Sequence, residues 1–256
     1  MKLYNLRKIK NKITIHLSDW ETDELLFKNE FSKIRKGWTV VDVGSEFGYY
    51  AIMAAQLVGK IGKVIAIEPH PMNYQVLKKN LSYYKLDNVI PVRKAAGSKR
   101  ETRKLYEASD LGGTSLLPPI NPYIGKRTFY KWIQLVKDGS FFSLLRQYIT
   151  TSSSSYYVLV DTLENILKEC GVDKVDLIKI DVEGFELEVL KGSLRILESH
   201  KPTLLIEVHR QELGQKSQVV YELLNQYGYD LFCEHRPMKT LVIARAPKSG
   251  NIFWDD

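Results

Sequence analysis

Residues 40–51, VVDVGSEFGYYA, carry the pattern that decides the fold. A short β-branched run contains Asp42, and Gly44 and Gly48 follow before a helical pattern begins. Glycines at a strand-to-helix turn let the backbone approach a ligand, and the first N–H groups of a helix have no partners within it. The stretch predicts a buried strand, a turn able to bind a ligand, and a helix. A tight turn also needs glycine, so this spacing alone does not decide function.

The flanking sequence repeats this alternation of short apolar runs and helical patterns, which is typical of parallel strands buried on both faces. The fold class is therefore α/β. The predicted strands are Thr39–Val43, Lys63–Glu68, Asn88–Arg93, Val175–Asp181, Thr203–His209, Tyr229–Cys233 and Thr240–Ala244. The predicted helices are Tyr49–Val58, Pro71–Tyr84, Asp161–Cys170, Phe185–Leu197 and Gln211–Tyr227. Residues 234–239 are too few for a crossover helix, so the last two strands form an antiparallel hairpin.

Two segments extend this single predicted domain of 256 residues. Residues 1–36 form an N-terminal extension, with a β-hairpin of Leu3–Ile9 and Lys12–Leu17 and a short helix within Asp19–Glu30. Residues 99–157 form an insert far longer than an ordinary loop. We predict that Lys126–Tyr148 folds into one or two helices of a substrate-facing lid, and that Thr150–Ser155 is a flexible joint.

The charge and the cysteine content set limits on partners and compartment. The net charge is +7, and residues 99–137 hold eight basic and three acidic side chains. This excess favours an anionic partner, such as a small anionic acceptor or nucleic acid, although a solvated lysine-rich surface explains it equally well. The sequence has two cysteines without CxxC spacing, no leader-like apolar segment and no apolar run of about 18 residues. We therefore expect a cytoplasmic protein without a transmembrane segment.

Acidic residues lie at the ends of two of the predicted strands. Glu68 ends the second strand 24 residues after Gly44, close to the offset of about 20 at which an acid holds ribose hydroxyls. Asp181 and Glu183 emerge from the fourth strand, where the sheet order is expected to reverse and ligands bind. Carboxylates there need a role or a partner, and Lys179 is one candidate partner in a purely structural ion pair.

The fifth strand ends in Glu207-Val-His209, and strand alternation places Glu207 and His209 on one face. His209 lies nearest the mouth of the predicted site. Its role is either catalytic or structural, because a lone histidine is often part of a core. No histidine pair has HxxxH spacing.

Four stretches together resemble the FkbM family of S-adenosylmethionine-dependent methyltransferases. They are VVDVGSEFGYYA, IEPHPMNYQVLKKNL, DLIKIDVEGFELEVLKG with Asp161-Thr-Leu before it, and PTLLIEVH. The resemblance spans roughly residues 38–210 and implies a Rossmann-like class I methyltransferase fold with strand order 3-2-1-4-5-7-6. The terminal hairpin agrees with this order independently.

The resemblance also implies roles for residues. Asp42, Gly44 and Gly48 would line the methionine end of the cofactor, Glu68 the ribose, and Ala95 and Ala96 the adenine. The predicted cofactor site is completed by the neighbouring Ser45, Glu46, Tyr49, Pro69 and Asp181. The family usually has Gly-Ala-Asn where this chain has Gly44-Ser45-Glu46, so Glu46 adds a negative charge, either near the cationic groups of the cofactor or toward solvent.

The expected reaction is O-methylation of a hydroxyl on a sugar, a glycolipid-like molecule or another small acceptor. The candidate catalytic residues are Asp181, Glu183, Glu207 and His209, with His209 or Asp181 as the base and Glu183 or Glu207 orienting it. A Mg²⁺ ion held by Asp181 and Glu183 is a further possibility, because this ion prefers carboxylate ligands. The alternatives are an RNA methyltransferase that uses the basic aromatic insert, and a non-catalytic binding module. A dehydrogenase is disfavoured, because GxGxxG is absent and the chain ends in a hairpin.

Overall fold

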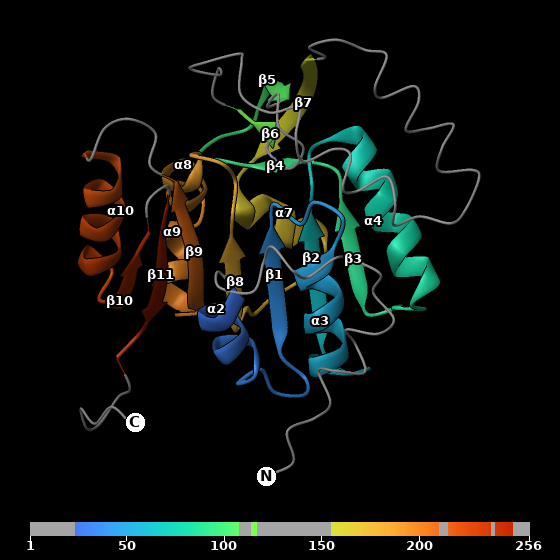
Figure 1. The fold of residues 1–256 in the computed structure, drawn as a ribbon, viewed down its shortest axis with the longest axis horizontal. Coiled ribbons are helices and arrows are strands. Elements are labelled where there is room, and N and C mark those ends of the chain that lie inside the picture. Colours follow the sequence, from blue (N-terminus) through green and yellow to red (C-terminus); the bar gives the residue numbers. More distant parts are fainter. Residues whose placement is uncertain (1–23, 108–113, 117–154, 210–214, 237–238, 248–256) are drawn as a thin grey trace.

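The computed structural model describes residues 24–107, 114–116, 155–209, 215–236 and 239–247. Their centre is a seven-stranded sheet with the order β10-β11-β9-β8-β1-β2-β3 (Figure 1). In the numbering of the predicted strands this is 3-2-1-4-5-7-6, so the expected order is confirmed. The strands are β1 (Thr39–Val43), β2 (Lys63–Ile67), β3 (Val89–Val92), β8 (Leu177–Ile180), β9 (Thr203–His209), β10 (Asp230–His235) and β11 (Lys239–Arg245).

Strands β3, β2, β1, β8 and β9 pair in parallel, and β11 pairs antiparallel with both β9 and β10. The predicted terminal hairpin is therefore confirmed. Alternate residues of β1 enter different cores: Val41 and Val43 pack in one apolar cluster and Val40 in the other. Because both faces are covered, the central strands are apolar almost throughout.

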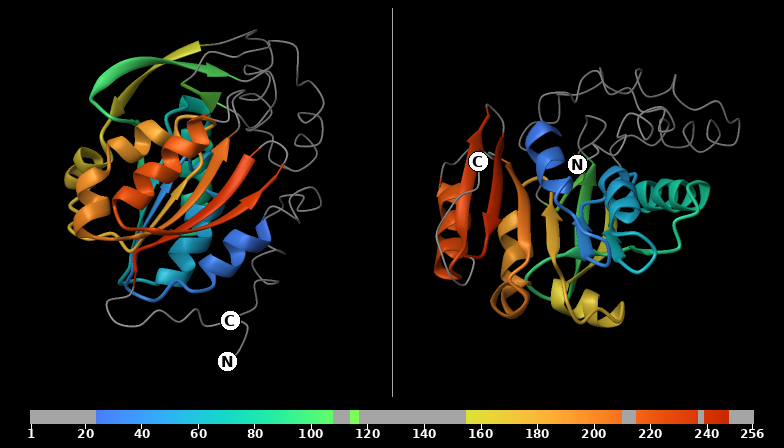
Figure 2. Two further views of the ribbon diagram at one scale, coloured as in Figure 1. Left: turned by 90° about the vertical axis from the view of Figure 1, so that its left-hand side faces the viewer. Right: turned by 90° about the horizontal axis from the view of Figure 1, so that it is seen from below.

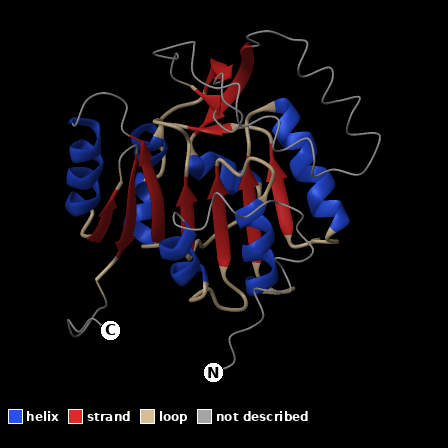
Figure 3. Cartoon of the chain, viewed as in Figure 1, coloured by secondary structure: helices blue, strands red, loops and turns tan. Residues whose placement is uncertain are grey.

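Helices cover the two faces of this sheet (Figures 2 and 3). The helices are α2 (Glu24–Phe31), α3 (Tyr49–Val58), α4 (Pro71–Tyr83), α7 (Leu163–Glu169), α8 (Glu186–Lys191), α9 (Leu194–Ser199) and α10 (Gln215–Gln226). Buried side chains of α2, α3 and α4 share one core, and those of α7 to α10 share the other. Helix α2 confirms the helix expected within the acidic stretch. The predicted N-terminal hairpin lies outside the described residues.

The single helix predicted for residues 185–197 is wrong, because α8 and α9 are separate. The carbonyl of Gly192 accepts a hydrogen bond from the N–H of Leu163 at 3.0 Å instead of continuing a helical ladder. A Cβ at Gly192 would lie 1.9 Å from the carbonyl oxygen of Gly97. The close passage of these two chain segments ends α8, and apolar periodicity carries no sign of it.

The described part of the insert is β-structure, which the sequence does not predict. Strands β4 (Ala95–Ala96), β5 (Glu101–Glu107), β6 (Thr114–Ser115) and β7 (Ser155–Asp161) form a second sheet with the order β4-β7-β5-β6. It lies beyond the carboxyl ends of the parallel strands (Figure 1). Of the predicted joint, only Ser155 is described, and it begins β7. The lid helices expected at 126–148 lie outside the described residues.

Among the described residues, no helix is both long and apolar enough to span a bilayer.

Candidate functional site

A pocket opens at the carboxyl ends of β1, β2 and β8, beneath the second sheet. Its walls come from the turns after these three strands, from β4 and from two apolar side chains of the second sheet. The lining residues are Val43, Gly44, Glu46, Ile67, Glu68, Pro69, Asn73, Ala95, Ala96, Leu105, Leu116, Asp181, Val182, Glu183 and Phe185. Three chain segments far apart in the sequence therefore meet where the sequence predicts ligand binding.

Most of the predicted cofactor residues line this pocket, and four do not. Asp42 is buried at 1% exposure, beneath the pocket. The hydroxyl of Ser45 donates to the carbonyl of Asp42 at 2.9 Å. Gly48 precedes α3 with φ of 92°, and the ring of Tyr49 packs edge-on against Tyr50. These four residues support the turn from within.

The turn after β1 needs glycine at position 44 for a reason that lies in the protein itself. Its φ is 77°, and an added Cβ would lie 1.9 Å from the carbonyl oxygen of Asp181. The N–H groups of Gly44 and Ser45 both donate to the carbonyl of Ile67 at 3.0 Å. Gly44 thus allows the turns after β1 and β8 to touch, which brings Asp181 to the pocket.

Glu68, the predicted ribose ligand, lines the pocket, and two backbone N–H groups hold its carboxylate. Its Oε1 accepts from the N–H of His70 at 2.8 Å, and its Oε2 accepts from the N–H of Glu46 at 2.9 Å. Burial raises the pKa of Glu68 to about 7, and the two backbone hydrogen bonds oppose that rise. A carboxylate has about four acceptor sites, so two remain for hydroxyl donors in the pocket.

Glu46 lines the pocket. Its φ is 51°, a left-handed conformation that is uncommon without glycine. Burial, followed by the charges of Glu68 and Asp181, raises the pKa of Glu46 to about 8. Three neighbouring carboxyl groups make this part of the pocket favourable for a cation.

Lys179 joins β1 to β8 through its buried ammonium group, which is 2% exposed. Its Nζ lies 3.2 Å from the carbonyl oxygen of Gly44, 3.3 Å from Oδ2 of Asp181 and 3.6 Å from Oδ1 of Asp42. It also lies 4.8 Å from the centre of the Tyr50 ring. The sequence indicated the contact with Asp181; the contact with Asp42 depends on strand register.

The charges of Lys179, Asp42 and Asp181 change one another's pKa values. Burial raises the pKa of Asp42, whose carboxylate oxygens accept no hydrogen bond from any described residue. Burial alone would also raise the pKa of Asp181, but the positive charges of Lys179, His209 and Lys239 together outweigh burial and hold that pKa below its ordinary value. Burial opposes the charge of Lys179, yet the two carboxylates raise its pKa. The lysine is therefore the counter-ion that lets two acids stay beside the pocket.

His209 is surrounded by carboxylates from the neighbouring β8–α8 segment. Its Nδ1 lies 3.0 Å from Oε1 of Glu186, and its Nε2 lies 3.5 Å from Oε2 of Glu183 and 3.9 Å from Oδ1 of Asp181. Burial lowers the pKa of His209, but the Glu186 hydrogen bond and the nearby carboxylates raise it to about 10. The ring is an imidazolium at neutral pH. Sequence reasoning missed Glu186, because a glutamate in the first turn of a helix is ordinary there.

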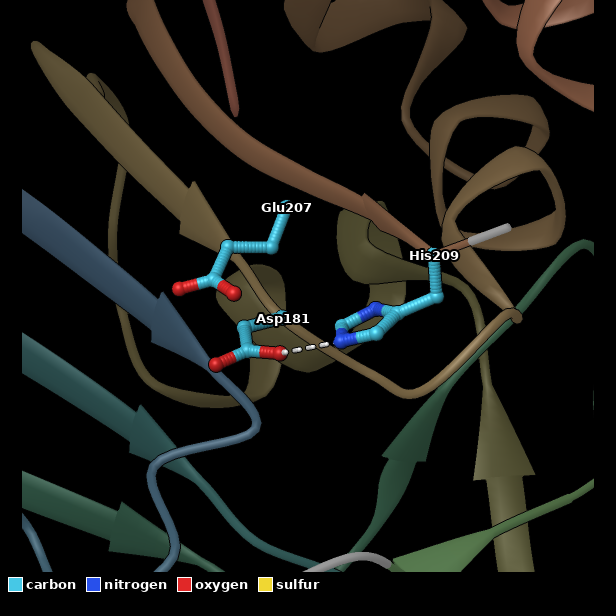
Figure 4. A group of neighbouring side chains, drawn as sticks. All are labelled: Asp181, Glu207 and His209. Carbon is cyan, nitrogen blue, oxygen red and sulfur yellow. Dashed lines mark ion pairs between the residues drawn. The ribbon is translucent and has the colours of Figure 1, made fainter. Parts of the chain in front are cut away.

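Asp181, Glu207 and His209 offer ligand atoms that lie within 4.8 Å of one another (Figure 4). This group differs from the predicted Mg²⁺ pair, because it contains Glu207 instead of Glu183. Each member already has a partner in the protein: Asp181 has Lys179, the Oε2 of Glu207 lies 2.5 Å from Nζ of Lys239, and His209 has Glu186. A metal would have to displace these cations or a proton.

Comparisons with known proteins find methyltransferases, and a family model identifies an FkbM methyltransferase domain in the chain. The sequence model described as "Methyltransferase FkbM domain" matches residues 42–231. The methyltransferase sdnD of Sordaria araneosa is 29% identical over 155 residues, which cover 60% of this chain and 59% of sdnD. Protein-L-isoaspartate O-methyltransferase 1 of Archaeoglobus fulgidus is 35% identical over 63 residues, covering 25% of this chain and 29% of that protein.

Among solved structures, the methyltransferase FkbM from Methylobacillus flagellatus KT superposes with a TM-score of 0.56 at 18% identity. The match covers 86% of this chain and 47% of that one. At this identity it shows a shared fold. The chain thus spans 59%, 29% and 47% of the length of these three relatives.

Proposed function

Because the chain belongs to the FkbM methyltransferase family, we propose that its pocket binds S-adenosylmethionine and that the protein transfers the methyl group to a hydroxyl oxygen. The acceptor we propose is a sugar, a glycolipid-like molecule or another small molecule. The observation that carries the proposal is the meeting of Glu46, Glu68 and Asp181 in one pocket at the carboxyl edge of the sheet.

The residues present fit this cofactor. Glu68 keeps acceptor sites for ribose hydroxyls, and Ala95 and Ala96 leave an apolar surface for a purine ring. Glu46 and Asp181 supply negative charge for the ammonium and sulfonium groups. Burial raises the pKa values of Glu46 and Glu68, so a cation bound beside them would stabilise both carboxylates.

S-adenosylmethionine supplies a methyl group on a sulfonium that is already a good leaving group, so positioning provides much of the rate. A hydroxyl acceptor must lose its proton to a nearby base. His209 carries its own proton at neutral pH, and Asp181 is paired with Lys179. Glu183 lines the pocket, and its side chain is 40% exposed, so an acceptor can reach it. Partial loss of water around the carboxyl, with the charge of Asp181, raises its pKa to about 7, which suits a base. We therefore assign the base role to Glu183, with His209 beside it. The sequence predicts the reverse, with His209 or Asp181 as the base and Glu183 or Glu207 orienting it.

The first test is calorimetric titration of ligand-stripped protein with S-adenosylmethionine and, separately, with NAD. We expect micromolar binding of S-adenosylmethionine alone. Glu68→Gln should weaken it at least about tenfold, whereas Glu198→Gln, on the exposed side of α9, should not change it. If neither ligand bound the wild-type protein, the proposal would fail and a binding module on this fold would replace it.

The second test is an acceptor screen with labelled S-adenosylmethionine, with sugars, glycolipids and RNA as separate arms. Label in the sugar or glycolipid arm supports the proposal, and label in RNA alone would make the protein an RNA methyltransferase. Asp181→Ala should abolish transfer while the protein stays folded. Because Lys179 and Lys239 neutralise the acids that Mg²⁺ would need, we expect equal turnover with EDTA and with added Mg²⁺. A chelator-sensitive rate would instead place an ion at Asp181.

A further inference from the structure

Glu186, the first residue of α8, makes two hydrogen bonds through one carboxylate oxygen. Its Oε1 accepts from the backbone N–H of Gly184 at 2.8 Å and lies 3.0 Å from Nδ1 of His209. Glu186 is 3% exposed, so both contacts are shielded from water. One buried side chain thus connects the turn after β8 to the end of β9.

The turn that Glu186 holds forms one wall of the pocket. Val182, Glu183 and Phe185 line the pocket, and Glu183 and Gly184 have φ values of 52° and 96°. Left-handed backbone at a residue other than glycine persists only where its surroundings enforce it. Two contacts do so here: the Gly184 N–H donates to Glu186, and the Glu183 carbonyl accepts from the hydroxyl of Ser115 at 2.9 Å.

We propose that Glu186 is a positioning residue for methyl transfer: it fixes the direction of the His209 ring and the backbone of the Glu183 turn together. With Nδ1 held by Glu186, Nε2 faces Glu183 at 3.5 Å and Asp181 at 3.9 Å. His209 then keeps the Glu183 carboxylate at the pocket. This role rests on the proposed function, whereas the two hydrogen bonds do not.

The charges around His209 explain why a buried glutamate is used here. The ring is faced by Glu186 from α8, by Asp181 and Glu183 from the segment after β8, and by Glu207 from its own strand. Lys239 of β11 pairs with Glu207. Without Glu186, the imidazolium could turn toward any of the other acids, and its direction would no longer be set.

Two substitutions separate the two contacts of Glu186. Glu186→Gln keeps the shape and an oxygen that can accept from Gly184, but it removes the charge that holds His209. Glu186→Ala removes both contacts. Glu198→Gln is the control, because Glu198 is exposed on the neighbouring short helix. Circular dichroism and the binding of S-adenosylmethionine establish that each variant is folded.

The first readout is the ¹⁵N spectrum of the His209 ring at neutral pH, assigned by comparison with His209→Gln. In the wild type we expect both ring nitrogens protonated and the Nδ1 proton protected from exchange. In Glu186→Ala that protection should be lost. A spectrum unchanged in Glu186→Ala would overturn the inference, and this measurement needs no acceptor, so it stands even if the proposed function fails.

The second readout is whether the substitutions change kcat or KM. With the acceptor identified, Glu186→Gln should lower kcat by about tenfold and Glu186→Ala by more, while KM for S-adenosylmethionine stays within about twofold. A rise in KM at constant kcat would mean that Glu186 only maintains the pocket, which would overturn the positioning role.

Discussion

Replacing Lys179 with methionine tests whether its ammonium is the counter-ion for both acids beneath the pocket. Methionine has a similar volume, so the substitution removes the charge with little change in packing. Asp42 is 1% exposed and would keep an unpaired carboxylate, whereas the side chain of Asp181 is 26% exposed and can be partly hydrated. Breaking a buried ion pair by removing one partner costs about 3–5 kcal/mol. Since only one of the two acids is fully buried, we expect the lower end, about 3 kcal/mol.

The assay is thermal and urea unfolding of the wild type and the variant at neutral pH. For a protein of this size, about 3 kcal/mol corresponds to a fall in Tm of about 6–12 °C. The matched control is Lys174→Met, because Lys174 is 74% exposed and lies 3.2 Å from Asp176, where an ion pair contributes at most about 1 kcal/mol. Similar losses for the two lysine variants would refute the reasoning.

The pH dependence of the stability loss in Lys179→Met is a second, independent test. Without Lys179, the pKa of Asp42 in the folded protein should rise further above its ordinary value of 3.8, since burial raises it already. A raised folded-state pKa means that stability is kept at acid pH and lost as pH rises. The deficit of Lys179→Met should therefore shrink toward acid pH. The double variant Asp42→Asn with Lys179→Met should recover most of the loss, because no buried charge is then left unpaired.

Two further predictions concern the turn after β1. Gly44→Ala should destabilise the fold by clearly more than Gly171→Ala. Both glycines have a positive φ, which costs an alanine about 1–2 kcal/mol at either position. A Cβ at Gly44 would also lie 1.9 Å from the carbonyl oxygen of Asp181, whereas a Cβ at Gly171 would meet no atom within 4 Å. Equal Tm values would refute the close approach. Burial raises the pKa of Glu46 from 4.5 to about 8. The wild type should therefore lose stability relative to Glu46→Gln as the pH rises from about 4.5 to about 8. Unfolding midpoints of both proteins at three pH values would check this prediction.

The sequence predicts the central sheet well, because its signals are local. Each parallel strand is mostly apolar, although Asp42, Lys179 and Glu207 interrupt β1, β8 and β9, and the short connection at 234–239 permits only a hairpin. The second sheet could not be predicted in this way. Strand β5, ETRKLYE, has one fully apolar residue, Leu105, which is 1% exposed and lies in the cluster with Phe185. A strand that pairs with residues some fifty positions later gives no periodic signal of its own.

The same division between local and distant contacts holds in the site. Glu68 follows its strand at a diagnostic offset, and its place in the pocket agrees with that prediction. Asp42 was expected to line the pocket and lies beneath it, since the register of β1 against β8 places it beside Lys179. Glu186 could not be identified either, because its function depends on the end of β9, 23 residues further along the chain.

The charge pattern of the site explains why these acids remain close together. Beneath the pocket, Asp42 and Asp181 share Lys179 as a counter-ion supplied by the protein itself. Inside the pocket, no lysine or arginine of the described residues makes an ion pair with Glu46 or Glu68, and burial raises the pKa of both. Ionising them costs free energy until a cation enters. A ligand with fixed positive charge would recover that free energy on binding, so two buried acids with raised pKa values favour a sulfonium over a neutral nucleoside of the same shape.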